Sequence, residues 1–187
     1  MNQSKQLFFI ALLAPTEVNL EVNNIKQHFA EVYHSKAALK SPPHVTLQPP
    51  FYWQTERLSD LKTLLQKFSQ ERSQIPMILD GFAAFRPRVI YVDVHRTTEL
   101  LAIHQELMKE LESTLGIVHR ASKTRPFAPH MTVGFKDLTK INFYKAWQEF
   151  KERQLYFEFV VSELTLLAHN GRRWEIEQNF GFNQNSV

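Results

Sequence analysis

Two five-residue segments of the chain carry the same pattern, Pro-His-apolar-Thr-apolar. Residues 43–47 read Pro-His-Val-Thr-Leu, and residues 129–133 read Pro-His-Met-Thr-Val. At average residue usage, such a pattern begins at roughly one position in a hundred thousand. Two copies in a chain of 187 residues therefore indicate a duplicated functional element.

Each copy reads as a short strand with alternating character. Residues i and i+2 of a strand share one face, so His44 and Thr46 lie on one side and the apolar residues on the other. His130 and Thr132 repeat this arrangement. An imidazole can give or take a proton near neutral pH, and a hydroxyl can donate a hydrogen bond. If the two copies face each other, they form a pocket with an acid, a base and two donors, which needs no metal.

The elements that would position these strands also occur twice. In the first half, periodicity predicts a strand at 7–14, a helix with apolar positions 18, 22, 25, 29 and 32, the His44 strand, a helix at 55–70 and a strand at 75–85. In the second half it predicts a strand at 89–94, a helical stripe from 100 to 115 capped by Thr97 or Thr98, the His130 strand, a helix near 142–152 and final strands with a hairpin at Asn170-Gly171.

Two β-α-β-α-β units, at approximately 6–86 and 88–182, are therefore expected within a single bilobal domain spanning residues 1–187. A pseudo-twofold axis between them would bring the two motif strands together at a shared cleft, where ligands commonly bind.

Composition excludes several classes of protein. An apolar fraction of 43% with 15 Phe supplies a core, so disorder is not expected. The absence of Cys excludes disulfides, thiolate nucleophiles and Cys-ligated zinc. The apolar run at 7–14 is short for a signal peptide and is closed by Pro15, and nothing approaches a membrane span. We expect a cytoplasmic protein, a monomer with no implied protein partner.

Charge is distributed in a way that suits an anionic ligand. The formal net charge is only +3, which argues against a protein that binds nucleic acid non-specifically over its whole surface. No acidic residue occurs between 32 and 55 or between 113 and 136, although both windows contain lysines, and the second also contains arginines. Each window holds one motif, so positive potential over the cleft is expected to favour a phosphate.

The two motifs and their setting resemble the two-histidine (2H) phosphoesterase superfamily. Its members carry two His-x-Thr/Ser-x motifs in a bilobal fold with internal symmetry. Residues 125–133, Arg-Pro-Phe-Ala-Pro-His-Met-Thr-Val, are similar to the second motif of its 2'-5' RNA ligase and cyclic phosphodiesterase branch. Residues 43–47, followed by Phe51, are similar to the first motif, and residues 81–94 to the central strand pair, so the likeness spans nearly the whole chain.

Two short segments differ from that branch. After the first motif the chain reads Gln48-Pro49-Pro50-Phe51, where the branch commonly has a Phe-Leu-Gly type of sequence. After the second motif it reads Gly134-Phe135-Lys136, where the branch often has a small residue and then Arg. Both pairs of His and Thr are intact.

The resemblance implies an α+β fold with two antiparallel sheets flanked by helices, an internal pseudo-twofold and a shared central cleft. It implies a metal-independent phosphodiesterase that hydrolyses a 2',3'-cyclic phosphate on a nucleoside or an RNA terminus, with no cofactor. His44 and His130 would be the acid–base pair, and Thr46 and Thr132 would donate to the phosphate oxygens. The reverse reaction would make a 2'-5' RNA ligase.

Further residues have two interpretations each. Arg125 could contact phosphate and Phe127 could stack on a base, or they could be a solvated loop residue and a core residue. Tyr91 could line the cleft or pack in the core. The aromatic run 51–53 could be a base platform or core. His95 and Asp93 have strand spacing, but no further ligand pattern supports a metal site.

The same motif residues are compatible with other functions. The protein could act on ADP-ribose cyclic phosphate or on 2'-5'-linked oligonucleotides. It could be a nucleotide- or RNA-binding protein that has lost turnover, or a metal-dependent phosphatase. The two complete His-Thr pairs favour an enzyme over a binding module.

Overall fold

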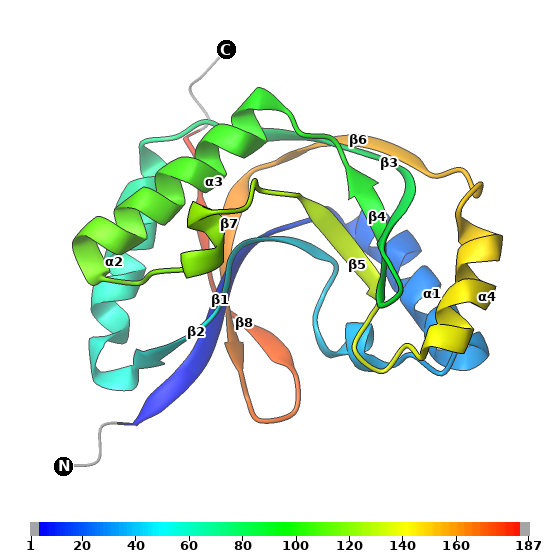
Figure 1. The fold of residues 1–187 in the computed structure, drawn as a ribbon. Helices are drawn as coiled ribbons and strands as arrows, with labels where there is room; N and C mark the ends of the chain where they lie inside the picture. Colours follow the sequence, from blue (N-terminus) through cyan, green and yellow to red (C-terminus); the bar gives the residue numbers. More distant parts are fainter. Residues whose placement is uncertain (1–3, 184–187) are drawn as a thin grey trace.

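The computed structural model describes residues 4–183, which form an α+β fold with two four-stranded antiparallel sheets (Figure 1). The strands are β1 (Lys5–Leu13), β2 (His44–Gln54), β3 (Ile75–Phe85), β4 (Val89–Val94), β5 (His130–Gly134), β6 (Tyr156–Val161), β7 (Glu163–His169) and β8 (Trp174–Gly181). The α-helices are α1 (Thr16–Val32), α2 (Leu58–Gln70), α3 (Thr98–Glu110) and α4 (Lys140–Phe150). Short helical turns are η1 (Ala37–Lys40), η2 (Thr55–Arg57), η3 (Leu111–Leu115) and η4 (Arg120–Lys123).

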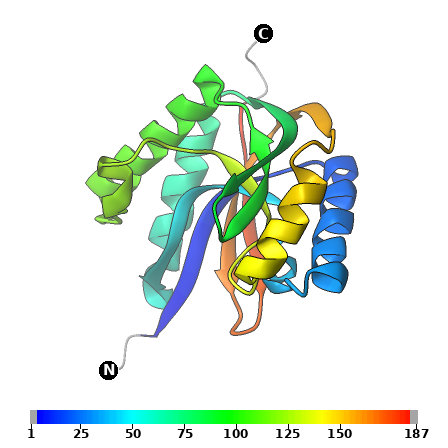
Figure 2. The ribbon, with the colours of Figure 1, turned by 45° about the vertical axis from the view of Figure 1, so that its right-hand side comes forward.

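The helices pack on the sheets in two pairs. The first sheet has the strand order β2-β1-β7-β8, and α2 and α3 pack against it. The second sheet has the order β5-β4-β3-β6, and α1 and α4 pack against it. Figures 1 and 2 show these two layers side by side from two directions. The predicted α+β class, with two antiparallel sheets flanked by helices, is confirmed.

The sheets do not follow the two halves of the sequence. β3, which belongs to the first half, pairs with β4 in the second sheet. A three-residue connection joins these strands, and such a short link forces antiparallel neighbours. In return, β7 pairs with β1 in the first sheet. Each sheet therefore contains strands from both halves, and the repeat boundaries at residues 6–86 and 88–182 stay a prediction.

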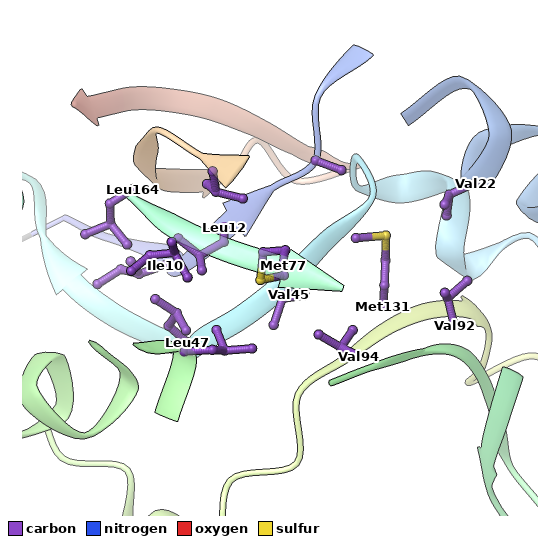
Figure 3. Close-up of a cluster of buried hydrophobic side chains, with 14 of the residues drawn as sticks. Ile10, Leu12, Val22, Val45, Leu47, Met77, Val92, Val94, Met131 and Leu164 are labelled. Atoms are coloured by element: carbon purple, nitrogen blue, oxygen red, sulfur yellow. The ribbon is translucent and has the colours of Figure 1, made fainter. Parts of the chain in front are cut away.

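One apolar cluster extends through both sheets and holds the motif strands in place. Val45 and Leu47 are buried on β2, and Met131 and Val133 are buried on β5. Figure 3 shows Val45 and Met131 in the same buried cluster, which also includes Val22 of α1. The predicted alternation is confirmed, since His44, Thr46, His130 and Thr132 are only partly buried.

Helix and hairpin signals in the sequence correspond to real boundaries. The Thr97 side chain caps α3 by accepting a hydrogen bond from the backbone of Leu100, as predicted. The helical stripe continues to 115 through the wider turn η3, which ends at Gly116 in a left-handed conformation. β7 and β8 form the predicted hairpin, whose loop is 170–173.

Residues 4–183 lack two features that would indicate other classes of protein. No helix in this range is long and apolar enough to cross a bilayer. The same residues include no group of three or more His, Cys, Asp or Glu side chains placed to hold a metal ion.

Candidate active site

Both motifs lie on outer strands that approach each other. β2 and β5 are edge strands of their respective sheets, and Cα atoms of the two strands come within 8 Å. His44 is the first residue of β2 and lies opposite Leu13 of β1. His130 is the first residue of β5 and lies opposite Asp93 of β4. The structure thus brings the two predicted catalytic histidines to the junction between the sheets.

The two imidazoles are held in the same way. His44 Nδ1 donates to the Pro42 carbonyl at 2.7 Å, and His130 Nδ1 donates to the Ala128 carbonyl at 2.8 Å. A carbonyl oxygen can only accept, so the bond places the ring proton on Nδ1. In the neutral ring, Nε2 then carries the lone pair that a general base needs.

Burial favours the neutral form of both rings. It lowers the pKa of His44 to about 4; the Pro42 hydrogen bond opposes this shift, and the charges of Lys26 and His130 add to it. Burial also lowers the pKa of His130, against the hydrogen bond to Ala128. Each ring is therefore neutral at pH 7 in the free protein. An anionic phosphate between them would favour protonation of one.

Aromatic side chains surround His44. The Phe9 ring lies 4.8 Å from the His44 ring, and Trp174 meets Phe9 edge-on at 4.6 Å. Phe9 and Trp174 belong to a small apolar cluster with Leu13, separate from the main core. We call these three residues the apolar shelf. It lies on the motif face of the first sheet, since β1 alternates between this cluster and the main core.

A different aromatic pair surrounds His130. The rings of Tyr91 and Phe85 lie 5.2 Å and 5.1 Å from the His130 ring. Tyr91 is opposite Thr132 in the sheet, and burial followed by the charge of Asp93 raises the pKa of its phenol. The structure thus places Tyr91 beside the second motif; its contact with substrate stays a prediction.

Arg125 and Phe127 lie elsewhere. Both line a pocket of about 520 Å³ beside α3, whose lining includes neither motif. Phe127 stacks on His104 in a parallel arrangement at 3.8 Å and packs against the main core. The structure does not bring this pair to the two motif histidines, so their role in substrate binding stays a prediction.

The aromatic run 51–53 lies towards the opposite end of β2 from His44. Trp53 is buried, and its Nε1 donates to the Arg57 carbonyl at 2.8 Å. Phe51 packs against the main core, whereas Tyr52 is exposed. Of the two interpretations, these residues fit core packing better than a base platform.

Asp137 ties together the loops that flank the two motifs. Its carboxylate accepts hydrogen bonds from Ser35 Oγ at 2.9 Å, Lys36 N at 2.8 Å and Ala37 N at 3.0 Å. The first loop leads into β2 and the second leaves β5. Sequence reading missed this residue, although it is the first acid after the acid-free window around the second motif.

Two more residues near the site were missed. Lys26 is 1% exposed on α1, where it falls on the same helical face as the apolar positions 22 and 29. That placement was a usable signal, because lysine is rarely buried. Phe9 gave no signal, since residues 7–14 are all apolar and their sequence shows no alternation of polar and apolar residues.

Comparisons with known proteins agree with this geometry. The family model described as "2'-5' RNA ligase superfamily" matches residues 14–173. Escherichia coli LigT in complex with 3'-AMP superposes with a TM-score of 0.68 at 21% identity, over 97% of this chain and 100% of that chain. TT0787 of Thermus thermophilus gives 0.67 at 18% identity, over 96% and 100%. A Geobacillus sp. (strain WCH70) protein named "putative phosphoesterase" is 28% identical over 163 residues, 85% of this chain and 88% of its own length. The chain belongs to the 2'-5' RNA ligase superfamily of two-histidine phosphoesterases, as its paired motifs predict.

Proposed function

We propose that this protein is a metal-independent phosphodiesterase that hydrolyses a 2',3'-cyclic phosphate on a nucleoside or an RNA terminus. One observation carries the proposal: two imidazoles with matching Nδ1 anchors stand at the junction of two edge strands, each with a hydroxyl on the same strand face. Acid–base hydrolysis at phosphorus needs this set of groups.

The proposed reaction proceeds by in-line displacement. One histidine takes a proton from water through Nε2, and the water oxygen forms a bond to phosphorus. The bond from phosphorus to a ribose oxygen breaks on the opposite side, and the second histidine donates a proton to that oxygen. Thr46 and Thr132 donate hydrogen bonds to the non-bridging oxygens and hold the phosphate in place. The product is a ribose monophosphate.

The same groups can also open the ring with an alcohol in place of water. A 5'-hydroxyl would give its proton to one histidine and attack the phosphorus of a 2',3'-cyclic phosphate. The bond to the 3' oxygen would break, the other histidine would protonate that oxygen, and two RNA ends would be joined through a 2'-5' bond. Escherichia coli LigT, which shares the fold, has been solved with 3'-AMP. A nucleoside monophosphate of this kind is what hydrolysis of a cyclic nucleotide would release, so that complex supports a nucleotide substrate here.

The apolar shelf supports a substrate with a nucleoside part. Phe9 and Trp174 present aromatic surface beside His44. Stacking on aromatic side chains suits any base, since every base has a π-face. A base or ribose held there would leave the cyclic phosphate between the two imidazoles. ADP-ribose cyclic phosphate and 2'-5'-linked oligonucleotides fit the same description.

A binding protein without turnover is the second candidate. The observation in its favour is that both histidines are neutral in the free protein, whereas acid catalysis needs one to be protonated. The negative charge of a bound phosphate is expected to supply that shift. Binding of a 2',3'-cyclic nucleotide without product at any pH from 5 to 9 would favour this candidate.

A panel assay tests the proposal. Purified protein is incubated in EDTA with 2',3'-cyclic nucleotides, an RNA ending in a 2',3'-cyclic phosphate, ADP-ribose cyclic phosphate and 2'-5' dinucleotides, and products are identified by chromatography. We expect turnover of at least one cyclic phosphate in EDTA and a bell-shaped pH profile. Loss of activity in EDTA with recovery on adding a divalent cation would point instead to a metal-dependent phosphatase.

A further inference from the structure

Lys26 is a buried lysine without an acidic partner. It lies in the interior of α1, is 1% exposed, and its Nζ donates to the Ser41 carbonyl at 3.0 Å. Among residues 4–183, no carboxylate lies within 4 Å of this ammonium group. A buried and unpaired charge destabilises a fold, so a protein that retains one commonly uses it at a functional site.

The backbone path links Lys26 to the first motif. Ser41, whose carbonyl accepts from Lys26, is followed directly by Pro42, whose carbonyl accepts from His44 Nδ1. The lysine therefore fixes the residue next to the one that orients the imidazole. Its charge also acts on the His44 ring.

The helix that carries Lys26 also packs against the strand of the second motif. α1 packs against β5 (Figure 1), and Gly134 makes this approach possible. A Cβ atom at Gly134 would come within 2.5 Å of the Phe29 ring. Phe29 is three residues from Lys26 and shares its helix face. The helix α1 thus joins the second sheet, through Phe29, to the segment before β2, through the hydrogen bond from Lys26 to Ser41.

The second half of the chain has no equivalent charge. The apolar positions 18, 25 and 29 of α1 recur as 100 and 107 of α3 and 111 of η3. The same offset places Met108 at the position of Lys26. Met108 is neutral and lines the pocket beside α3. The causes that shift the His130 pKa are burial and the Ala128 hydrogen bond, with no cation among them.

We propose that Lys26 is a positioning residue that makes His44 the general base and leaves His130 as the general acid. The Lys26 ammonium group, which a bound phosphate keeps protonated, disfavours a second positive charge on His44, so the proton that an anionic substrate attracts goes to His130. His44 then keeps the Nε2 lone pair that accepts the proton of water, and His130 protonates the departing ribose oxygen. This inference rests on the proposed function.

The other charged groups near His44 and Lys26 do not offset the difference in charge between the surroundings of His44 and those of His130. His44 faces Lys26 from α1 and His130 from β5, while the nearest part of β1 presents Phe9 and Leu13. η1 contributes Lys40, and Lys36 immediately precedes this turn; both lysines are exposed. Glu149 of α4 is engaged by His28 and Tyr33, near the C-terminal end of α1. Burial lowers the pKa of Lys26 itself to about 7, and a bound phosphate would raise it again.

Titration of the histidine rings by NMR tests the positioning role without relying on activity. Lys26→Met is compared with wild type, with Lys26→Arg, and with Lys145→Met, which removes an exposed helical lysine on α4. We expect Lys26→Met to raise the titration midpoint of His44 and to leave that of His130 nearly unchanged. Lys26→Arg, which keeps the charge, should shift it less, and Lys145→Met not at all. An unchanged His44 midpoint, or equal shifts of both rings, would overturn the inference.

Kinetics with two leaving groups test the assignment of base and acid. A cyclic phosphate releases a ribose oxygen that needs protonation, whereas a p-nitrophenyl phosphodiester of the nucleoside releases an anion that does not. We expect His130→Ala to regain most of its activity on the p-nitrophenyl ester and His44→Ala to stay slow on both. Recovery of His44→Ala instead would reverse the roles. If wild type turns over neither ester, the proposed function fails while the ring titrations still report on Lys26.

The pH profile links the two tests. Lys26→Met should lower kcat by up to about 100-fold, as displaced catalytic groups do, and leave KM less affected. The acid limb of its profile should move to higher pH, because His44 must lose a proton to act. A uniform loss at every pH, together with a lower unfolding temperature, would indicate that Lys26 only supports the fold.

Discussion

The two motif strands share one backbone arrangement and differ in what surrounds the imidazole. Both histidines begin an edge strand, follow a buried proline and donate Nδ1 to the carbonyl two residues before. His44 has a buried cation and the apolar shelf beside it, whereas His130 has Phe85 and Tyr91. The two rings thus share one backbone geometry, and the side chains that surround each ring give it a different electrostatic environment.

Removing either imidazole is expected to have the largest effect. His44→Ala and His130→Ala should each lower kcat on a 2',3'-cyclic nucleotide by about 10²-fold to 10⁴-fold, the usual range for acid–base catalysis. The double variant should lose little more than the worse single variant, because the two groups act as a unit. Hydrolysis by the double variant at the wild-type rate would rule the mechanism out.

Removing the threonine hydroxyls is expected to have the next largest effect. Thr46→Val and Thr132→Val keep the side-chain shape and remove one donor each, so each should lower kcat by about 10-fold to 10³-fold if the hydroxyls stabilise developing charge. Thr→Ser at the same positions should keep most of the activity. Normal kcat in both Val variants would show that these hydroxyls do not touch the phosphate in the transition state.

A glycine on β5 tests how α1 is brought to the site. Gly134→Ala places a methyl group 2.5 Å from the Phe29 ring. Overpacking of this kind typically costs about 1–3 kcal/mol and should lower the unfolding temperature by several degrees. Gly181→Ala is a matched control, because nothing lies within 4 Å of its added Cβ. Equal unfolding temperatures for the two variants would contradict the close packing of α1 on β5.

Acid sensitivity of the fold is expected to be a smaller effect. The pKa of His44 in the folded chain, about 4, lies below its usual 6.5, so the folded state resists protonation. The contribution of His44 to the free energy of unfolding is therefore fully present above pH 6.5 and is lost as the pH falls towards 4. At pH 5 the loss is roughly 1–2 kcal/mol. His44→Asn should narrow the difference in unfolding temperature between pH 7 and pH 5, and His34→Asn, at an exposed position, should not. If the unfolding temperature of His44→Asn changes as much between pH 7 and pH 5 as that of wild type, the low pKa of His44 in the folded chain is refuted.

Local features of the fold were predictable from the sequence, because they depend on nearby residues. The alternation of the motifs, the capping of α3 by Thr97 and the β7–β8 hairpin all follow from spacing and turn chemistry. The pairing of β3 with β4 in the second sheet could not be predicted from the sequence, because periodicity identifies strands but not the strands with which they pair.

The site was predictable to a similar extent. Duplication singled out the motif residues, and the strand period placed His and Thr on one face. Lys26 and Phe9 were missed because their roles depend on tertiary packing: one sits on an otherwise apolar helix face, and the other on a strand buried on both sides. Arg125 and Phe127 were close in sequence to the second motif, but the chain turns them towards α3.

The most direct measurement is a crystal structure of the protein with a nucleoside 3'-monophosphate. We expect one phosphate at the junction of β2 and β5, with Nε2 of His44 and of His130 on opposite sides within hydrogen-bond distance and both threonine hydroxyls on its free oxygens. A phosphate bound in the pocket beside α3, or one that contacts a single histidine, would contradict the account.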